Sequence, residues 1–269
     1  MSKKLLLIDG SSMLVTCFYG NAHFLYQKTG DTSKLMQTKD GVFTNGVYTM
    51  AKTLLNIIKK QKPTHIAVAW DVNRESLVRR QKYEAYKANR AETKPELGEQ
   101  FGTMQLVLKA MNIPTFNLIS HEADDIIGTF AKKFEQDIPT YVMTKDQDAL
   151  QLITENTRVW LGTKSAEKMY GERGIDHKTL NIPDGFFEFT PLTFQEEYGI
   201  QPIQMIDKKA VEGDSSDNIP GVRGVGPTAV VPLLQEYGTL EEIYEVIENN
   251  PEKELKEFFK TLGIKQSPI

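Results

Sequence analysis

The chain has 269 residues, of which 40% are hydrophobic and 25% charged, and its formal net charge is −4. This composition is typical of a globular protein with one large domain, or one domain and a smaller appendage. A single cysteine, Cys17, excludes an internal disulfide framework and a cysteine-based zinc site. No apolar stretch approaches the length of a transmembrane helix, so no membrane partner is expected. The first apolar run is too short for a signal peptide, and we therefore expect a cytoplasmic protein.

Strand and helix patterns alternate along the first part of the chain. Apolar runs predict strands at residues 4–10, 64–71, 139–148 and 157–161. Apolar residues at helical spacing predict helices at residues 45–61, 100–113 and 121–136, with another helical turn from 149. This alternation predicts an α/β fold with a central, mostly parallel, twisted sheet and helices on both faces. Ligands of such sheets bind beyond the carboxyl ends of the strands.

Acidic residues gather at that predicted edge, where they end strands or open a helix: Asp9, Asp71, Glu122, Asp124, Asp125, Asp146 and Asp148. Taken singly, each is explained as a turn residue, a helix cap or an acid in the first turn of a helix. Taken together, seven carboxylates at one edge would repel one another unless cations lie among them. Oxygen ligands without cysteine or paired histidine indicate Mg²⁺ or Mn²⁺ rather than zinc.

A basic stretch separates the second predicted strand from the next helix. Residues 72–94 contain seven basic and three acidic side chains, although the whole chain is acidic. Cations and tyrosines recur there at helical spacing: Arg79, Tyr83, Tyr86, Lys87 and Arg90. Such a face suits a phosphate backbone flanked by stacked bases, and the alternative is a solvated helix face.

A second acidic and glycine-rich segment lies at residues 209–234. Asp214 and Asp217 precede three glycines, Gly221, Gly224 and Gly226, and Thr228 then starts a helix. The glycines permit a tight turn and bring backbone N–H groups close to an anion, and the helix N-terminus favours phosphate. The pattern predicts a helix–hairpin–helix that binds nucleic-acid backbone, and the alternative is a plain turn between helices.

Six segments stand in the order found in the flap endonuclease/5′ nuclease family: LLLIDGSS, AWD, RRQKYEAYKANR, EADD, TKDQDALQL and VEGDSSDNIPGVRGVGPTA. Over residues 3–245 the chain resembles that family, and in particular the 5′→3′ exonuclease domain of bacterial DNA polymerase I. The resemblance implies a PIN/5′-nuclease-like core at residues 1–200 with a helical arch at about 72–100. A helical DNA-binding subdomain at 201–269 would supply Asp214 and Asp217 to the active site. The chain is then either a stand-alone bacterial flap endonuclease or a fragment of a longer polymerase.

The resemblance also implies a role for individual residues. It assigns five acids to a first divalent cation: Asp9, Asp71, Glu122, Asp124 and Asp146. It assigns four to a second: Asp125, Asp148, Asp214 and Asp217. Both cations are expected to be Mg²⁺, with Mn²⁺ as a substitute, and K⁺ is a further candidate at the helix–hairpin–helix turn. Lys87 and Arg90 match catalytic cations that contact the scissile phosphate, and Arg79 matches another arch cation. The expected DNA-binding residues are Arg80, Lys82, Tyr83, Tyr86, Gly221, Gly224, Gly226 and Thr228.

The implied function is that of a structure-specific 5′ nuclease. It would act as flap endonuclease and 5′→3′ exonuclease by two-metal-ion hydrolysis, leaving 5′-phosphate and 3′-hydroxyl ends, in Okazaki fragment processing and DNA repair. The expected partner is branched or 5′-ended DNA, including RNA-containing strands, bound by a monomer. Two alternatives stay open: a DNA-binding or scaffolding protein with silent carboxylates, and a metal-dependent ribonuclease of the PIN group. Residues 163–197 are longer than the hairpin expected there and receive no function.

Overall fold

The computed structural model describes residues 3–22, 24–72, 75–223 and 225–262. The chain forms two compact units that interleave in sequence. Unit 1 comprises residues 1–77, 91–149 and 156–188, and unit 2 comprises residues 78–90, 150–155 and 189–269. Among the described residues, no helix has both the length and the apolar character needed to cross a membrane.

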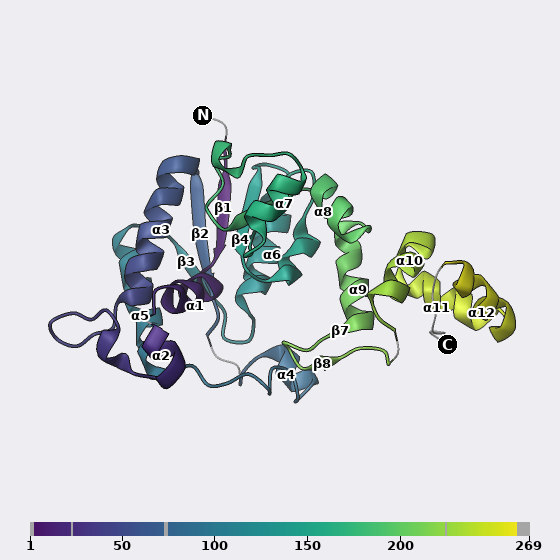
Figure 1. The fold of residues 1–269 in the computed structure, drawn as a ribbon, viewed down its shortest axis with the longest axis horizontal. Coiled ribbons are helices and arrows are strands. Elements are labelled where there is room, and N and C mark those ends of the chain that lie inside the picture. Colours follow the sequence, from purple (N-terminus) through teal and green to yellow (C-terminus); the bar gives the residue numbers. More distant parts are fainter. Residues whose placement is uncertain (1–2, 23, 73–74, 224, 263–269) are drawn as a thin grey trace. The chain divides into compact units, whose positions relative to one another are not determined.

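A six-stranded sheet forms the centre of unit 1, in the order β3-β2-β1-β4-β5-β6. Figure 1 labels its strands β1 to β4. Its strands are β1 (Leu5–Asp9), β2 (His65–Trp70), β3 (Thr115–Asn117), β4 (Thr140–Thr144), β5 (Thr157–Gly162) and β6 (Phe186–Phe189). The strand β1 pairs in parallel with both β2 and β4, and these continue in parallel to β3 and β5. Because β1, β2 and β4 run in one direction, the segments that follow them leave the sheet at one edge.

Helices cover both faces of this sheet. Those of unit 1 are α1 (Gly10–Gly20), α2 (Phe24–Thr29), α3 (Asn45–Gln61), α5 (Pro95–Ala110), α6 (Ala123–Phe134) and α7 (Ala166–Glu172), with 3₁₀ turns η1 (Thr32–Lys34) and η3 (His177–Thr179). Leu6 and Ile8 of β1 share one buried core with side chains of α1, α3 and α5. Successive strand residues point to opposite faces, and α6 packs against β1 to β4. The predicted α/β fold with a mostly parallel sheet is confirmed.

Unit 2 is mainly helical. It contains α4 (Val78–Lys82), α8 (Pro191–Tyr198), η4 (Pro202–Gln204), α9 (Met205–Glu212), α10 (Pro227–Tyr237), α11 (Leu240–Asn249) and α12 (Glu252–Thr261). A two-stranded antiparallel hairpin, β7 (Gly213–Asp214) and β8 (Ile219–Pro220), lies between α9 and α10 in the chain. The order helix, hairpin, helix predicted for residues 209–234 is therefore present.

The basic stretch differs from its predicted helical form. The periodicity predicted over residues 79–90 holds only in α4, which ends at Lys82. Residues 84–89 form turns, and Lys87 adopts a left-handed backbone conformation with φ of 56°. A residue with positive φ cannot continue an α-helix, so the side chains that follow leave the predicted face. The helical turn expected from residue 149 belongs to the 3₁₀ segment η2 (Gln147–Leu152).

Candidate active site

Asp9 lies at the carboxyl end of β1, where it also caps α1. One carboxylate oxygen accepts the backbone N–H of Ser12 at 2.9 Å. The other accepts the hydroxyl of Thr144 at 2.8 Å. The side chain is 5% exposed. Both oxygens of this buried carboxylate are therefore held by neutral donors.

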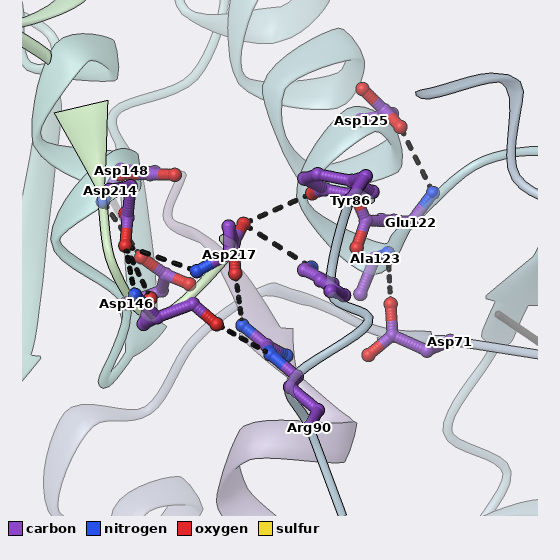
Figure 2. Close-up of polar contacts among 12 residues, drawn as sticks. Asp71, Tyr86, Arg90, Glu122, Ala123, Asp125, Asp146, Asp148, Asp214 and Asp217 are labelled. Carbon is purple, nitrogen blue, oxygen red and sulfur yellow. Dashed lines mark hydrogen bonds and ion pairs between the residues drawn. The ribbon is translucent and has the colours of Figure 1, made fainter. Parts of the chain in front are cut away.

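Asp71 directly follows β2, and its side chain is hydrogen-bonded to the start of α6. Its carboxylate accepts the backbone N–H of Ala123, the first residue of α6, at 2.8 Å (Figure 2). Its own backbone N–H donates to the hydroxyl of Ser11 at 3.0 Å. Asp71 is thereby tied both to the start of α1 and to the start of α6, the two helices that begin beside this edge.

Two of the three acids at the start of α6, Glu122 and Asp125, form a capping box that closes its first turn. The backbone N–H of Glu122 donates to the carboxylate of Asp125 at 2.9 Å, which closes the first turn of the helix (Figure 2). Glu122 is buried and Asp124 is partly buried. The N-terminal dipole of α6 makes this crowding of acids tolerable, as the sequence alone suggested.

Asp146 and Asp148 lie on the loop after β4. The backbone N–H of Asp146 donates to the hydroxyl of Thr144 at 3.0 Å. The backbone N–H of Asp148 donates to the carboxylate of Asp146 at 2.9 Å. A chain of short local hydrogen bonds therefore sets the path of this acidic loop.

Five of these acids are linked through charge interactions with Asp9 or Asp124 and are here called the edge cluster: Asp9, Asp71, Glu122, Asp124 and Asp146. Burial, together with the charges of Asp71 and Asp146, raises the pKa of Asp9 to about 7, although the hydrogen bonds from Ser12 and Thr144 oppose the rise. Burial and the charges of the other four acids raise the pKa of Asp124 well above its ordinary range.

An all-oxygen set of carboxylates, in which burial and neighbouring charges raise the pKa of Asp9 and Asp124, fits a divalent cation. A bound cation would remove the repulsion that raises these pKa values. Mg²⁺ and Mn²⁺ prefer such hard oxygen ligands, whereas Zn²⁺ favours nitrogen and sulfur. The residues of the edge cluster are therefore chemically suited to the cation that the sequence predicted for them.

The two acids of unit 2 have cationic partners. Asp214 accepts from the ammonium of Lys209 at 2.8 Å, and from the backbone N–H and hydroxyl of Ser216 at 2.7 and 2.6 Å. Burial alone would raise the pKa of Asp214, but the bonds from Lys209 and Ser216 outweigh it and lower that pKa.

Asp217 forms a second ion-paired centre in unit 2. Its carboxylate pairs with the guanidinium of Arg90 and lies 3.6 Å from the ammonium of Lys87. The phenol of Tyr86 donates to it at 3.1 Å (Figure 2). The backbone N–H of Lys87 also donates to the carbonyl of Asp217 at 2.9 Å. The two predicted catalytic cations thus share one predicted metal ligand.

The remaining basic-stretch residues differ in their exposure. Arg79, Lys82 and Tyr83 are exposed, and Arg80 is half-buried. The ring of Tyr86 is only 5% exposed, so in this conformation it offers no face to a stacking base. Tyr83 is 42% exposed and does offer one.

The glycines of the helix–hairpin–helix serve different ends. A Cβ on Gly221 would lie 2.2 Å from the carbonyl oxygen of Glu212, so glycine is needed there for close backbone packing. Gly226 caps α10 and has open space around it, while Thr228 lies exposed in the first turn of that helix. Gly224 lies outside the described residues.

Three hydroxyl residues that hold the acids in place were missed in the sequence: Ser11, Ser12 and Thr144. Each binds an acid or its neighbour through a short hydrogen bond. A signal was present, because Ser11 and Ser12 follow Asp9 by two and three positions and Thr144 precedes Asp146 by two. Hydroxyl residues at such spacing from acids at strand ends commonly bind backbone N–H groups in turns.

Comparison with known proteins identifies close relatives along almost the whole chain. Residues 4–179 match the 5′-3′ exonuclease N-terminal resolvase-like domain, and residues 200–264 match the 5′-3′ exonuclease C-terminal SAM fold. The chain is 35% identical over 250 residues to a 5′-3′ exonuclease of Halalkalibacterium halodurans. The aligned region covers 92% of this chain and 75% of that protein. It is 37% identical over 256 residues to DNA polymerase I of Bacillus subtilis, covering 95% of this chain. The chain spans about a quarter of the length of that polymerase, 26%.

Solved structures of similar fold include nucleases bound to DNA. The bacteriophage T5 D15 flap endonuclease, in a complex with DNA and metal ions, is 19% identical and has a TM-score of 0.67, covering 97% of this chain and 86% of that one. The catalytic core of Rad2, in a complex with DNA substrate, is 14% identical with a TM-score of 0.52, covering 97% of this chain and 73% of that one. At these identities the likeness shows a shared fold.

Proposed function

Because this chain belongs to the 5′-3′ exonuclease family, a family of nucleases, we propose that it is a structure-specific 5′ nuclease that acts as flap endonuclease and 5′→3′ exonuclease. It hydrolyses phosphodiesters of DNA to 5′-phosphate and 3′-hydroxyl products. The observation that carries this proposal is the edge cluster at the carboxyl edge of the sheet, where burial and the charges of neighbouring acids raise the pKa of Asp9 and of Asp124.

The edge cluster is proposed to hold the first divalent cation. The second is proposed to be held by four acids: Asp125, Asp148, Asp214 and Asp217. The physiological ion is Mg²⁺, for which Mn²⁺ substitutes. When bound, the two cations supply Lewis-acid activation of the attacking water and stabilisation of the leaving oxygen. The solved T5 and Rad2 structures with metal ions or DNA support this assignment by analogy of fold.

The basic side chains of unit 2 are proposed to act on the phosphate. Lys87 and Arg90 stabilise negative charge that develops at the scissile phosphate, with Arg79 as a further cation. For this, Lys87 and Arg90 must exchange Asp217 for the phosphate. An anion that replaces a carboxylate leaves the cations paired throughout, so neither is left buried and unpaired.

The DNA interface is proposed to lie on unit 2. Arg80, Lys82 and Tyr83 contact the single strand near the cleaved bond, and Tyr83 is the stacking residue. The loop with Gly221, Gly224 and Gly226 and the first turn of α10 at Thr228 bind the duplex backbone, with K⁺ as a candidate ion at this turn. Gly221 is also needed for packing of this loop, because a Cβ there would collide with the carbonyl of Glu212.

The proposed substrates are flaps, nicks and overhangs with a 5′ end, including strands that begin with RNA. These arise in Okazaki fragment processing and DNA repair, which places the proposed action of this protein in the cytoplasm of a bacterium. The proposed active species is a monomer.

Cleavage of a labelled 5′-flap DNA in Mg²⁺ tests the proposal. The wild-type chain is expected to release the flap with a 5′-phosphate, and EDTA or Asp146→Ala is expected to abolish release. Asp184→Ala is the matched control, because Asp184 is an exposed acid outside the site. Unimpaired cleavage by Asp146→Ala would contradict the metal assignment, and loss of cleavage in Asp184→Ala would show that the effect is not specific.

A further inference from the structure

Thr144 links two acids of the edge cluster. It is the last residue of β4, and only 3% of it is exposed. Its hydroxyl accepts the backbone N–H of Asp146 at 3.0 Å and lies 2.8 Å from a carboxylate oxygen of Asp9. A hydroxyl has one hydrogen, and the ionised carboxylate has none to offer, so Thr144 donates to Asp9. The end of β1 and the loop after β4 are thereby joined through one side-chain oxygen.

The bonds around Asp9 fix its carboxylate without neutralising it. Thr144 holds one oxygen and the backbone N–H of Ser12 holds the other at 2.9 Å. Rotation of the carboxylate would break both bonds. Because both donors are neutral, neither cancels the negative charge of the ionised carboxylate, whereas a lysine or arginine in place of Thr144 would cancel it.

A second bond joins the same two segments. The hydroxyl of Ser12 accepts the backbone N–H of Lys145 at 3.3 Å. The start of α1 and the loop that carries Asp146 are thus held at two points. Loss of the Thr144 hydroxyl would leave the Asp146 N–H without this acceptor and one Asp9 oxygen without this donor.

We propose that Thr144 is a positioning residue of the first cation site. Its hydroxyl sets the orientation of Asp9 and the path of the loop that carries Asp146, so that both carboxylates face one cation with their charge intact. The inference rests on the proposed function, because the cation is the one assigned there to Asp9 and Asp146. The sequence pattern predicted only that Thr144 is part of a strand.

Calorimetric titration of the DNA-free protein with Mn²⁺ tests this role without using activity. Thr144→Val keeps the side-chain shape and removes the hydroxyl, and it is expected to weaken Mn²⁺ binding roughly 10- to 100-fold, the effect typical of residues that orient metal ligands. Thr144→Ser keeps the hydroxyl and is expected to bind Mn²⁺ nearly as the wild type does.

Thr157→Val is the matched control. Thr157 is fully buried at the start of β5, and its hydroxyl donates to the carboxylate of Glu135 at 3.2 Å. This variant also removes a buried hydroxyl-to-carboxylate bond, but outside the edge cluster. It is expected to lower stability while leaving Mn²⁺ affinity unchanged. Equal weakening of Mn²⁺ binding in Thr157→Val and Thr144→Val would overturn the inference.

Further outcomes separate this inference from the proposed function. Wild-type affinity in Thr144→Val overturns the positioning role alone, while failure of the wild type itself to bind Mn²⁺ contradicts the proposed function. Cooperative thermal unfolding in EDTA checks that each variant folds, and Thr144→Ala replaces Thr144→Val if the valine disturbs packing. In an Asp9→Asn background, Thr144→Val is expected to weaken Mn²⁺ binding much less than it does alone, and an undiminished effect would overturn the link to Asp9.

Discussion

The acids of the two units are held in opposite ways. In unit 1, Asp9 accepts hydrogen bonds from a backbone N–H and a hydroxyl, and burial together with its acidic neighbours raises its pKa. In unit 2, Asp214 pairs with Lys209, and Asp217 pairs with Arg90 beside Lys87. In unit 1 the groups that donate to Asp9 are neutral, whereas in unit 2 positively charged side chains balance the carboxylates.

This difference separates two tasks that carboxylates perform in one chain. An uncompensated buried cluster has a high free energy until a cation binds, so it favours cation binding strongly. A carboxylate paired with arginine or lysine gains less from a cation, but it keeps those side chains ordered until another anion replaces it. Substitutions that neutralise Asp9 and Asp214 are therefore expected to change the free energy of unfolding in opposite directions.

The largest expected effect is on catalysis. Asp9→Asn keeps the side-chain shape but removes one charge from the centre of the edge cluster. Single-turnover cleavage of a 5′-flap in Mg²⁺ is expected to fall on the order of 10³-fold, because a fixed cation ligand is lost. Asp214→Asn is expected to reduce the cleavage rate less, since the ammonium of Lys209 already balances the charge of Asp214. Equal losses would contradict the distinction between the two units.

The next effect is the pH dependence of stability without metal. The pKa of Asp9 is raised from about 4 in an unfolded chain to about 7 in the folded protein, so its protonated form stabilises the fold. That contribution is fully present below about pH 4 and is lost as pH rises through about 7. In urea unfolding with EDTA at pH 8, the free energy of unfolding of Asp9→Asn is expected to exceed that of the wild type by a few kcal/mol.

Asp214 supplies the matched control for that measurement. Its pKa is lowered in the folded protein, so its contribution to stability is present above the unfolded value of about 4 and is lost on acidification below it. Asp214→Asn is therefore expected to be less stable than the wild type at pH 8. A stabilising Asp214→Asn, or a destabilising Asp9→Asn, would contradict the electrostatic comparison.

The hairpin that carries Asp214 depends on one close backbone contact. Gly221→Ala is expected to lower the free energy of unfolding by about 2–3 kcal/mol, because its Cβ would collide with the carbonyl of Glu212. Gly226→Ala meets open space and is expected to cost about 1 kcal/mol or less, the usual cost of alanine at an N-cap. Denaturant unfolding of the two variants measures this, and equal costs would contradict the packing role of Gly221.

The smallest expected effect concerns the ion pair of Asp214. Lys209→Met removes its partner and is expected to cost about 1 kcal/mol in denaturant unfolding at pH 7. Lys256→Met is the control, since the Lys256–Glu252 pair is exposed and such pairs contribute little. Similar costs for both variants would show that the Asp214 pair contributes no more than an exposed one.

The sheet and its acidic edge could be predicted because their signals are local. Short apolar runs ended by Asp9 and Asp71 indicate buried strands, and parallel strands bring those ends to one edge. The helix that begins near Glu122 was predicted for the same reason, since acids open it and apolar residues recur along it.

The basic stretch could not be predicted in the same way. Tyr86 and Lys87 have helical spacing with Arg79 and Tyr83, yet the chain turns at Lys87 and buries Tyr86 against Asp217. Asp217 is 131 positions away from Tyr86, so no local pattern announces the contact. The contact between the Thr144 hydroxyl and Asp9 also has no local pattern, because it spans 135 positions; only the spacing of Thr144 from Asp146 is a local signal.

The most direct test of the edge cluster is a Mn²⁺ titration of the DNA-free protein at pH 6.5, repeated in two buffers with different heats of ionisation. The difference in heat reports the protons released on binding. Because Asp9 has a pKa of about 7 and that of Asp124 is also raised, cation binding is predicted to release protons from the wild type, and fewer from Asp9→Asn. Absence of Mn²⁺ binding, or binding without proton release, would contradict the assignment of the edge cluster as an uncompensated cation site.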